Sequence, residues 1–195
     1  FGDLRDINIL SESLKNCNTV VHLASLISIP YSYKSSRSYF QTNVLGLINL
    51  IESSQKHMIS KFIHTSTSEV YGTSQAKKIS EKHRLFAQSP YAASKISADK
   101  VVESYVNSFS FPAITLRPFN TFGPRQSNRA VIPTIITQIL SGEQKIYLGN
   151  TKTKRDFNYI DDTINAFLLA IKSKKFIGKT YNIGSGNNYS IKEIV

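Results

Sequence analysis

The sequence contains almost no cysteine, and no stretch of it is apolar for long enough to cross a membrane. Cys17 is the only cysteine among 195 residues, which excludes a disulfide bond within the chain. The four histidines do not show the spacing of a metal-binding motif, so we interpret each of them as structural. The N-terminus also lacks the pattern of a signal peptide. These features predict a folded cytoplasmic protein with no metal and no membrane partner.

Acidic residues are scarce as well, with 13 Asp and Glu against 24 Lys and Arg, which gives a formal net charge of +11. A charge of this sign is typical of proteins with polyanionic partners. The basic residues, however, stand in short clusters such as 152–155 and 172–175, without a continuous stripe or a nucleic-acid motif. We therefore favour a solvated basic surface that suits a small phosphate-bearing ligand, and we expect no nucleic-acid partner.

Short runs of β-branched residues alternate with longer amphipathic segments, which is the pattern of an α/β protein. Parallel strands need helical crossovers, so we predict a Rossmann-like, doubly wound parallel sheet. The expected strands are 18–24, 61–67, 112–118, 145–148 and 179–184, with a further short strand within 155–160. The expected helices are 7–16, 36–57, 90–109, 131–141 and 161–173.

Two features predict context beyond this chain. The expected helix 36–57 is apolar on more than one face, so it can pack on the sheet and on a partner subunit, and we expect a homodimer. Both ends interrupt an element: the chain opens in the loop phrase FGDLRD, and Ser190 and Glu193 form a capping box for a helix that has barely begun. We interpret the sequence as a fragment of a longer protein.

The phrase STSEVYG, residues 66–72, ends an apolar strand in a cluster of hydroxyl groups and one carboxylate. Polar turns commonly follow strands, so Thr67 and Glu69 are by themselves compatible with an ordinary turn. Downstream, YAASK places Tyr91 and Lys95 four residues apart, on one face of a helix. An ammonium group beside a phenol favours the phenolate and so lowers a pKa that is ordinarily about 10.

A βα unit brings the end of a strand next to the start of the following helix, at the carboxyl edge of the sheet where ligands bind. We therefore predict a proton-transfer site that consists of Thr67, Ser68, Glu69, Tyr91 and Lys95.

Other polar residues are expected at the same edge of the sheet. The phrase RPFNTFGPRQ, residues 117–126, is predicted to be a loop in which Asn120 bonds a ligand and Arg125 pairs with phosphate. An ordinary turn explains Asn120 and Arg125 equally well, and Arg155 in RDFNYIDD is a second candidate for phosphate. The GSG at 184–186 lacks the third glycine of a dinucleotide-binding fingerprint and indicates a strand-to-helix turn.

Eight phrases in order resemble the extended short-chain dehydrogenase/reductase family, the NAD-dependent nucleotide-sugar epimerases and dehydratases. They are GDLRD, VVHLAS, TNVLG, STSEVYG, SPYAASK, RPFNTFGPRQ, RDFNYIDD and YNIGSG. The resemblance implies a partial NAD(P)-binding Rossmann domain over 1–120, without its N-terminal glycine-rich βαβ unit. It also implies an incomplete, smaller region over 121–195, interleaved with the sheet, that binds the nucleotide sugar. It implies NAD as the cofactor and a nucleotide sugar as the substrate.

The resemblance also implies roles for single residues. Tyr91 matches the catalytic base, and Lys95 matches the residue that bonds the nicotinamide ribose and lowers the pKa of the tyrosine. Thr67 matches a contact to the sugar O4, and Asn120 and Arg155 match contacts to the diphosphate region. The implied cofactor contacts further include Asp3, Leu4, Leu23, Ala24, Ser25 and Thr42.

Glu69 is the residue that divides the family. An epimerase completes its cycle at C4, whereas a 4,6-dehydratase must also remove the C5 proton and expel the C6 hydroxyl. Glu69 fits the added base. Ser68 stands where dTDP-glucose dehydratases carry Asp, so the resemblance does not identify the group that donates a proton to the C6 hydroxyl. The triplet Thr-Ser-Glu occurs both in GDP-mannose 4,6-dehydratases and in UDP-glucuronate decarboxylases.

Two further phrases, residues 27–44 and 126–142, resemble most the 4,6-dehydratases of the legionaminic acid pathway, which act on a nucleoside-diphosphate N-acetylglucosamine. We therefore expect a 4,6-dehydratase of cell-surface polysaccharide biosynthesis that makes a 4-keto-6-deoxy sugar nucleotide. The alternatives are a UDP-sugar 4-epimerase, a UDP-glucuronate decarboxylase, or an incomplete and inactive binding fragment.

Overall fold

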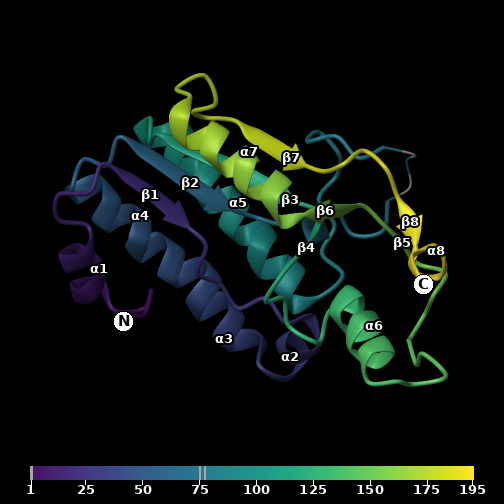
Figure 1. Ribbon diagram of the computed structural model, residues 1–195. Coiled ribbons are helices and arrows are strands. Elements are labelled where there is room, and N and C mark those ends of the chain that lie inside the picture. Colours follow the sequence, from purple (N-terminus) through teal and green to yellow (C-terminus); the bar gives the residue numbers. More distant parts are fainter. Residues whose placement is uncertain (1, 75, 77) are drawn as a thin grey trace. The chain divides into compact units, whose positions relative to one another are not determined.

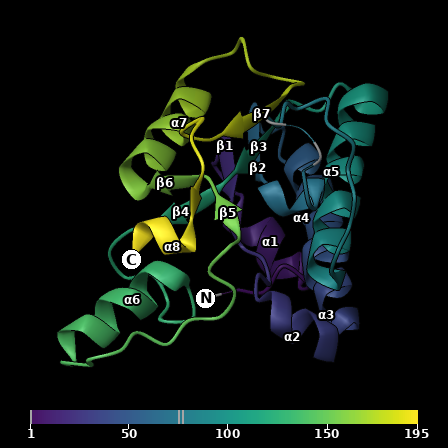
Figure 2. The same ribbon diagram turned by 90° about the vertical axis from the view of Figure 1, so that its right-hand side faces the viewer.

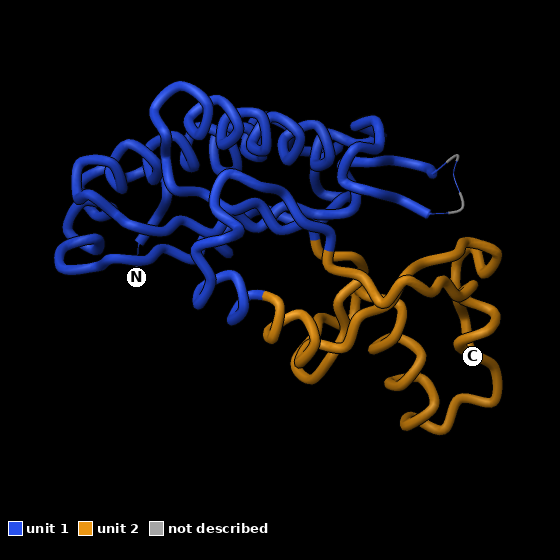
Figure 3. The backbone as a smooth tube through the Cα atoms, turned by 90° about the horizontal axis from the view of Figure 1, so that it is seen from above, with its two compact units in different colours: residues 1–117, 167–182 blue, residues 118–166, 183–195 orange. Residues whose placement is uncertain are grey.

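The computed structural model describes residues 2–74, 76 and 78–195 (Figure 1). The chain forms two compact units, which Figure 3 shows in different colours. The first unit comprises Phe1–Arg117 and Phe167–Asn182, and the second comprises Pro118–Ala166 and Ile183–Val195. We predicted that residues 1–120 bind the cofactor and that residues 121–195 bind the substrate. The division into two compact units does not test this assignment, which stays a prediction.

A four-stranded sheet forms the centre of the first unit. Its strands lie in the order β1 (Thr19–His22), β2 (Lys61–Thr65), β3 (Ala113–Pro118) and β7 (Thr180–Ile183). The first three strands are parallel, with Val21 opposite Ile63 and Ile63 opposite Ile114. β2 and β3 are buried along almost their whole length because helices cover both faces of a parallel sheet. The predicted Rossmann-like α/β fold is confirmed.

Helices α4 (Gly46–Lys56) and α5 (Pro90–Phe109) cover one face of this sheet, and α1 (Ile7–Ser13) packs on α4 (Figures 1 and 2). The end of α7 (Ile160–Lys172) touches β2, where the Lys61 ammonium donates to the carbonyl oxygens of Ile171 and Ser173. The core between the sheet and α4 and α5 is apolar and includes Leu47, Ile51, Phe62, Ala98, Val102 and Phe111.

The expected helix 36–57 is in fact three successive segments. They are α3 (Ser36–Phe40), a π-helical segment η1 (Gln41–Leu45) and α4, and a short helix α2 (Ile29–Lys34) precedes them. A π-helical turn interrupts the ordinary hydrogen-bond pattern without ending the helix, so the apolar periodicity does not reveal it. The expected helix 90–109 matches α5 at both ends.

The second unit contains two small sheets. β4 (Asn120–Phe122) pairs in parallel with β6 (Phe157–Tyr159), and β5 (Lys154–Arg155) pairs in antiparallel fashion with β8 (Tyr189–Ser190). The helices of this unit include α6 (Val131–Leu140) and α8 (Ile191–Ile194). α8 begins with the predicted capping box, in which Ser190 and Glu193 bond each other's main chain.

Two local predictions for the second unit are wrong. The segment 117–126 is not only a loop, because its residues 120–122 form β4. The expected strand 145–148 is absent from the described secondary structure: the main chain of Tyr147 bonds the side chain of Gln138 in both directions, at 2.8 and 3.1 Å. A side-chain partner thus replaces the strand partner that the apolar pattern suggested.

Across the described residues, no helix is both long and apolar enough to span a membrane.

Candidate active site

The start of α5 positions Tyr91 and Lys95. Ser89 caps the helix by accepting a hydrogen bond from the Ala92 amide at 3.0 Å, and Pro90 occupies a first-turn position that tolerates proline. Tyr91 is 7% exposed and Lys95, one turn later, is 2% exposed. The helix thus presents a phenol and an ammonium group from one face, as the sequence predicted.

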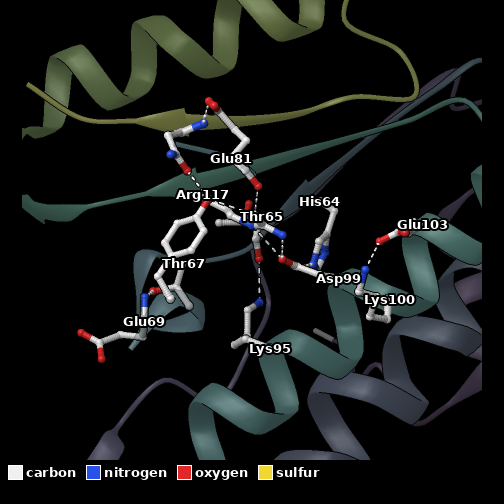
Figure 4. A network of polar contacts seen from close by, with 12 residues as sticks. His64, Thr65, Thr67, Glu69, Glu81, Lys95, Asp99, Lys100, Glu103 and Arg117 are labelled. Carbon is white, nitrogen blue, oxygen red and sulfur yellow. Dashed lines mark hydrogen bonds and ion pairs between the residues drawn. The ribbon is translucent and has the colours of Figure 1, made fainter. Parts of the chain in front are cut away.

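Lys95 points from α5 toward the carboxyl end of β2 (Figure 4). Its Nζ donates a hydrogen bond of 2.6 Å to the main-chain oxygen of Thr65. Burial lowers the pKa of Lys95 to about 8, because the charged form loses its hydration, while the nearby carboxylate of Asp99 acts in the opposite direction. Lys95 therefore keeps a titratable charge near neutral pH.

Tyr91 shares a hydrogen bond with Thr67 and lies within reach of the charge of Glu69. Burial raises the pKa of the Tyr91 phenol to about 12, hydrogen bonding with Thr67 lowers it, and the negative charge of Glu69 raises it again. The structure thus brings Thr67, Glu69 and Tyr91 together, as the sequence predicted. A phenol with this pKa becomes a base near neutral pH only when further positive charge lies beside it.

Thr67 has a second role, as the cap of the turn that carries the carboxylate. The 3-10 turn η2 (Ser68–Tyr71) packs on α5, and the Thr67 hydroxyl accepts a hydrogen bond from the Glu69 amide at 3.2 Å. The Glu69 side chain is half-buried, and its carboxylate points away from the polar network of Arg117 (Figure 4). Ser68 is half-buried in the same turn. Among the residues that the structure describes, the Glu69 carboxylate forms no ion pair, and its charge acts on the Tyr91 phenol.

The residues expected to contact the cofactor follow β1 or precede α1. Leu23 is 65% exposed just after β1, Ala24 is also exposed, and Ser25 donates to Asn43 at 2.9 Å. Thr42 lies half-buried in η1. An exposed apolar residue at the carboxyl end of a parallel strand fits a flat organic ring, so these residues fit part of a dinucleotide site.

Asp3 and Leu4 lie on the loop before α1. Arg5 binds both carboxylate oxygens of Asp3, at 2.9 and 2.6 Å, and this hydrogen bonding lowers the pKa of Asp3 to about 2. The carboxylate is half exposed and so keeps accepting positions for an adenine or ribose. Leu4 is half-buried, and its carbonyl oxygen accepts from Asn49 at 3.2 Å. This loop also fits the expected cofactor.

Asn43 is a site residue that our sequence analysis did not identify. It is 1% exposed in η1 and accepts from the Leu26 amide at 2.8 Å. Its amide donates to the Leu26 carbonyl and to the Ser94 hydroxyl, both at 3.0 Å. Asn43 therefore ties the loop after β1 to the helix of Tyr91 and Lys95. The π-helical segment that holds it, although common at functional sites, has no simple sequence signal.

Asn120, Arg125 and Arg155 belong to the second unit. The Asn120 amide donates to the Asp156 carbonyl at 3.0 Å within the small β4–β6 sheet, and its side chain is half-buried. Arg155 is exposed on β5, and Arg125 is exposed with a left-handed φ of 67°. Their expected contacts to the diphosphate of a substrate stay a prediction.

The comparison with protein families gives a match over the whole chain: the family model described as GDP-mannose 4,6 dehydratase covers residues 1–195. A dTDP-D-glucose 4,6-dehydratase from Dictyostelium discoideum is 36% identical over 94% of this chain and 45% of its own length. The chain therefore spans about half the length of this relative.

Solved structures give the same family and fold. DesIV, a dTDP-glucose 4,6-dehydratase from Streptomyces venezuelae solved with NAD and TYD bound, matches with a TM-score of 0.92 and 28% identity. The match covers 99% of this chain and 60% of that one. A UDP-N-acetylglucosamine 4-epimerase from Methanobrevibacter ruminantium M1, in complex with UDP-N-acetylmuramic acid, also gives a TM-score of 0.92, with 33% identity over 99% and 63% of the two chains.

Proposed function

The chain belongs to the NAD-dependent epimerase/dehydratase family, and on that premise we propose that the whole protein is a nucleotide-sugar 4,6-dehydratase. The observation that carries this proposal is the Glu69 carboxylate, which the Thr67 cap holds on a turn beside the Tyr91 phenol. A 4-epimerase uses a base at C4 alone. A second base next to the first is what an elimination from C5 and C6 requires.

The proposed substrate is a nucleoside-diphosphate N-acetylglucosamine, as in the legionaminic acid pathway. The support for it is the resemblance of residues 27–44 and 126–142 to those dehydratases. The proposed cofactor is NAD, which Tyr91, Lys95, Asp3 and the residues after β1 would hold. Bound NAD supplies the acceptor, and later the donor, of the hydride in this reaction.

In the proposed mechanism, Tyr91 takes the proton of the C4 hydroxyl while C4 is oxidised to a ketone. Thr67 bonds the phenol, and the charge of Lys95 lowers its pKa. The 4-ketone acidifies the neighbouring C5 hydrogen, and Glu69 removes it as a proton. The C6 hydroxyl then leaves as water, with its proton from Glu69 or Ser68. Bound NAD would supply the hydride for C6, and with a proton returned to C5 the product would be a 4-keto-6-deoxy sugar nucleotide without net oxidation.

The test of this proposal is the mass of the product that the full-length protein makes from UDP- and GDP-N-acetylglucosamine. We expect a product that has lost one water. A 4-epimerase is the second candidate, and the 33% identity to the Methanobrevibacter epimerase favours it; it would give an unchanged mass with inverted C4. A UDP-glucuronate decarboxylase would instead release carbon dioxide from UDP-glucuronate.

We also propose that the whole protein is a homodimer and acts in the cytoplasm. The exposure of apolar residues on the segment that precedes α4 supports the dimer, since Phe40 is 38% and Leu45 is 56% exposed. Sedimentation of the full-length protein at micromolar concentration tests it, and a monomer would refute it.

A further inference from the structure

Arg117, which ends the first unit at β3, is a buried cation that the proposed mechanism does not use. It is only 6% exposed. Its Nε donates to Asp99 Oδ2 at 2.9 Å, and a second nitrogen, NH2, lies 2.8 Å from the same oxygen. The other oxygen of Asp99 lies 3.2 Å from His64 Nε2. Asp99 is thus held by β2 and β3 at once (Figure 4).

The remaining guanidinium nitrogen of Arg117 reaches the turn that carries Glu69. NH1 donates to the phenol oxygen of Tyr71 at 2.9 Å, and the guanidinium carbon lies 5.1 Å from the centre of the Tyr71 ring. The Tyr71 hydroxyl in turn donates to Asn182 Oδ1 at 2.6 Å, and Tyr71 is 1% exposed. The hydroxyl and the ring face of Tyr71 are therefore both engaged.

These contacts join the two elements that carry the proposed catalytic groups. Asp99 is one helical turn after Lys95 on α5, and Tyr71 is two residues after Glu69 in η2. A buried ion pair costs hydration that its own attraction barely repays, so stability alone is a weak reason for this arrangement. Buried hydrogen bonds that join several segments do, however, fix the relative positions of those segments.

We propose that Arg117 is a positioning residue: it holds the turn Ser68–Tyr71, and with it Glu69, against the helix that carries Tyr91 and Lys95. The inference rests on the proposed dehydratase function. Tyr91 and Lys95 are fixed by their own helix, so oxidation at C4 depends on Arg117 only through the Thr67 cap of the turn, and therefore less than the step at Glu69 does. Removal of the C5 proton depends on where the turn places Glu69, and a misplacement of about 1 Å slows such a step by as much as a hundredfold.

The test uses Tyr71→Phe in the full-length, cofactor-loaded protein. This variant keeps the ring under the guanidinium and removes only the hydroxyl. Tyr105→Phe is the matched control, because the Tyr105 hydroxyl also bonds a side chain, Glu52 at 3.3 Å, but near the surface. Arg117→Lys is a second variant, which keeps the charge but loses the forked contact.

Two rates are measured in a single turnover: the appearance of reduced cofactor by absorbance, which reports C4 oxidation, and the loss of water by mass spectrometry. We expect Tyr71→Phe and Arg117→Lys to slow water loss about tenfold or more while oxidation changes less than about threefold, with unchanged KM and cofactor content. Reduced cofactor should therefore accumulate in both variants, and not in Tyr105→Phe.

The inference is wrong if oxidation and water loss fall by the same factor, which is what a general loss of stability produces, or if neither rate changes. Failure of the proposed function looks different, because it appears in the unmodified protein. A wild-type protein that inverts C4 without losing water overturns the dehydratase assignment and, with it, the role of Arg117 in elimination. A melting temperature measured for each variant separates misfolding from mispositioning.

Discussion

The ammonium group of Lys95 donates a hydrogen bond of 2.6 Å to the main-chain oxygen of Thr65, two residues before Thr67. This bond fastens the helix of the proposed base to the strand whose end leads into the Glu69 turn. It also holds a charged group in a position that is 2% exposed. The contact therefore serves the proposed chemistry, while the burial of the charge lowers the free energy of unfolding.

Replacing this lysine is expected to stabilise the protein. Burial lowers the pKa of Lys95 to about 8 from the ordinary value of 10.5, so below pH 8 the folded state carries a charge that the unfolded state holds at less cost. Lys95→Met removes the charge and keeps most of the volume. We expect the free energy of unfolding at pH 7 to rise by about 1–3 kcal/mol, measured by urea denaturation, while activity is lost.

The change of the free energy of unfolding with pH is a second test of this prediction. Between about pH 8 and 10.5 the folded state has released the lysine proton and the unfolded state still binds it, so this group makes stability rise with pH. Lys95→Met should lack that rise. Lys100→Met, on the exposed side of the same helix, should change stability by less than about 0.5 kcal/mol. A Lys95→Met protein that is less stable than wild type at pH 7 would contradict the account.

Tyr91→Phe should remove the proposed base and leave the fold intact. We expect turnover to fall by about 10²–10⁴-fold with the bound cofactor retained, because only the phenol oxygen is lost. Steady-state kinetics and the cofactor content of the purified variant measure this. Tyr33→Phe, in which the altered side chain is 62% exposed, should retain wild-type turnover. If Tyr91→Phe turned over at the wild-type rate, another group would have to be the base.

Glu69→Gln should separate the two halves of the reaction. The variant keeps the shape of the side chain but cannot accept the C5 proton, so we expect water loss to slow by about a hundredfold or more while C4 oxidation continues. Because the Glu69 charge raises the pKa of Tyr91, its loss should also move the pH at which oxidation begins to lower values. The pH profile of cofactor reduction measures this shift. Glu103→Gln, which alters an exposed carboxylate, is the control.

Asn43→Ala should loosen the loop after β1. Loss of the Asn43 side chain leaves the half-buried Leu26 amide without its acceptor and removes the donor to the buried Ser94 hydroxyl, so we expect a loss of about 2–4 kcal/mol in the free energy of unfolding. Urea denaturation measures it. Asn49→Ala, which removes one contact to the half-buried Leu4, should cost about 1 kcal/mol. Equal effects of the two variants would show that Asn43 has no special structural role.

Local patterns in the sequence predicted the elements that carry the site. The Ser89–Pro90 start of α5 and the short strand pattern of β2 depend on neighbouring residues, so the spacing predicted the positions of Tyr91 and Thr67. The π-helical turn around Asn43 was missed because its cause lies in distant partners, Leu26 and Ser94, rather than in the turn itself.

The buried ion pair of Asp99 and Arg117 could not be predicted from the sequence either. Asp99 and Arg117 are 18 residues apart, on a helix and a strand that also carry ordinary apolar patterns, so each resembles a surface charge in the sequence. Only the packing of α5 on the sheet makes them partners. The false strand at 145–148 has a similar origin, because the contact that decides it is the Gln138 side chain.

The most direct test of the central assignment is the mass of the sugar nucleotide that the full-length protein releases, measured in parallel for wild type, Glu69→Gln and Glu103→Gln. We predict that wild type and Glu103→Gln convert a nucleoside-diphosphate N-acetylglucosamine into a product lighter by one water, and that Glu69→Gln forms this product about a hundredfold more slowly or less. A wild-type product of unchanged mass with inverted C4, formed equally well by Glu69→Gln, would contradict the assignment.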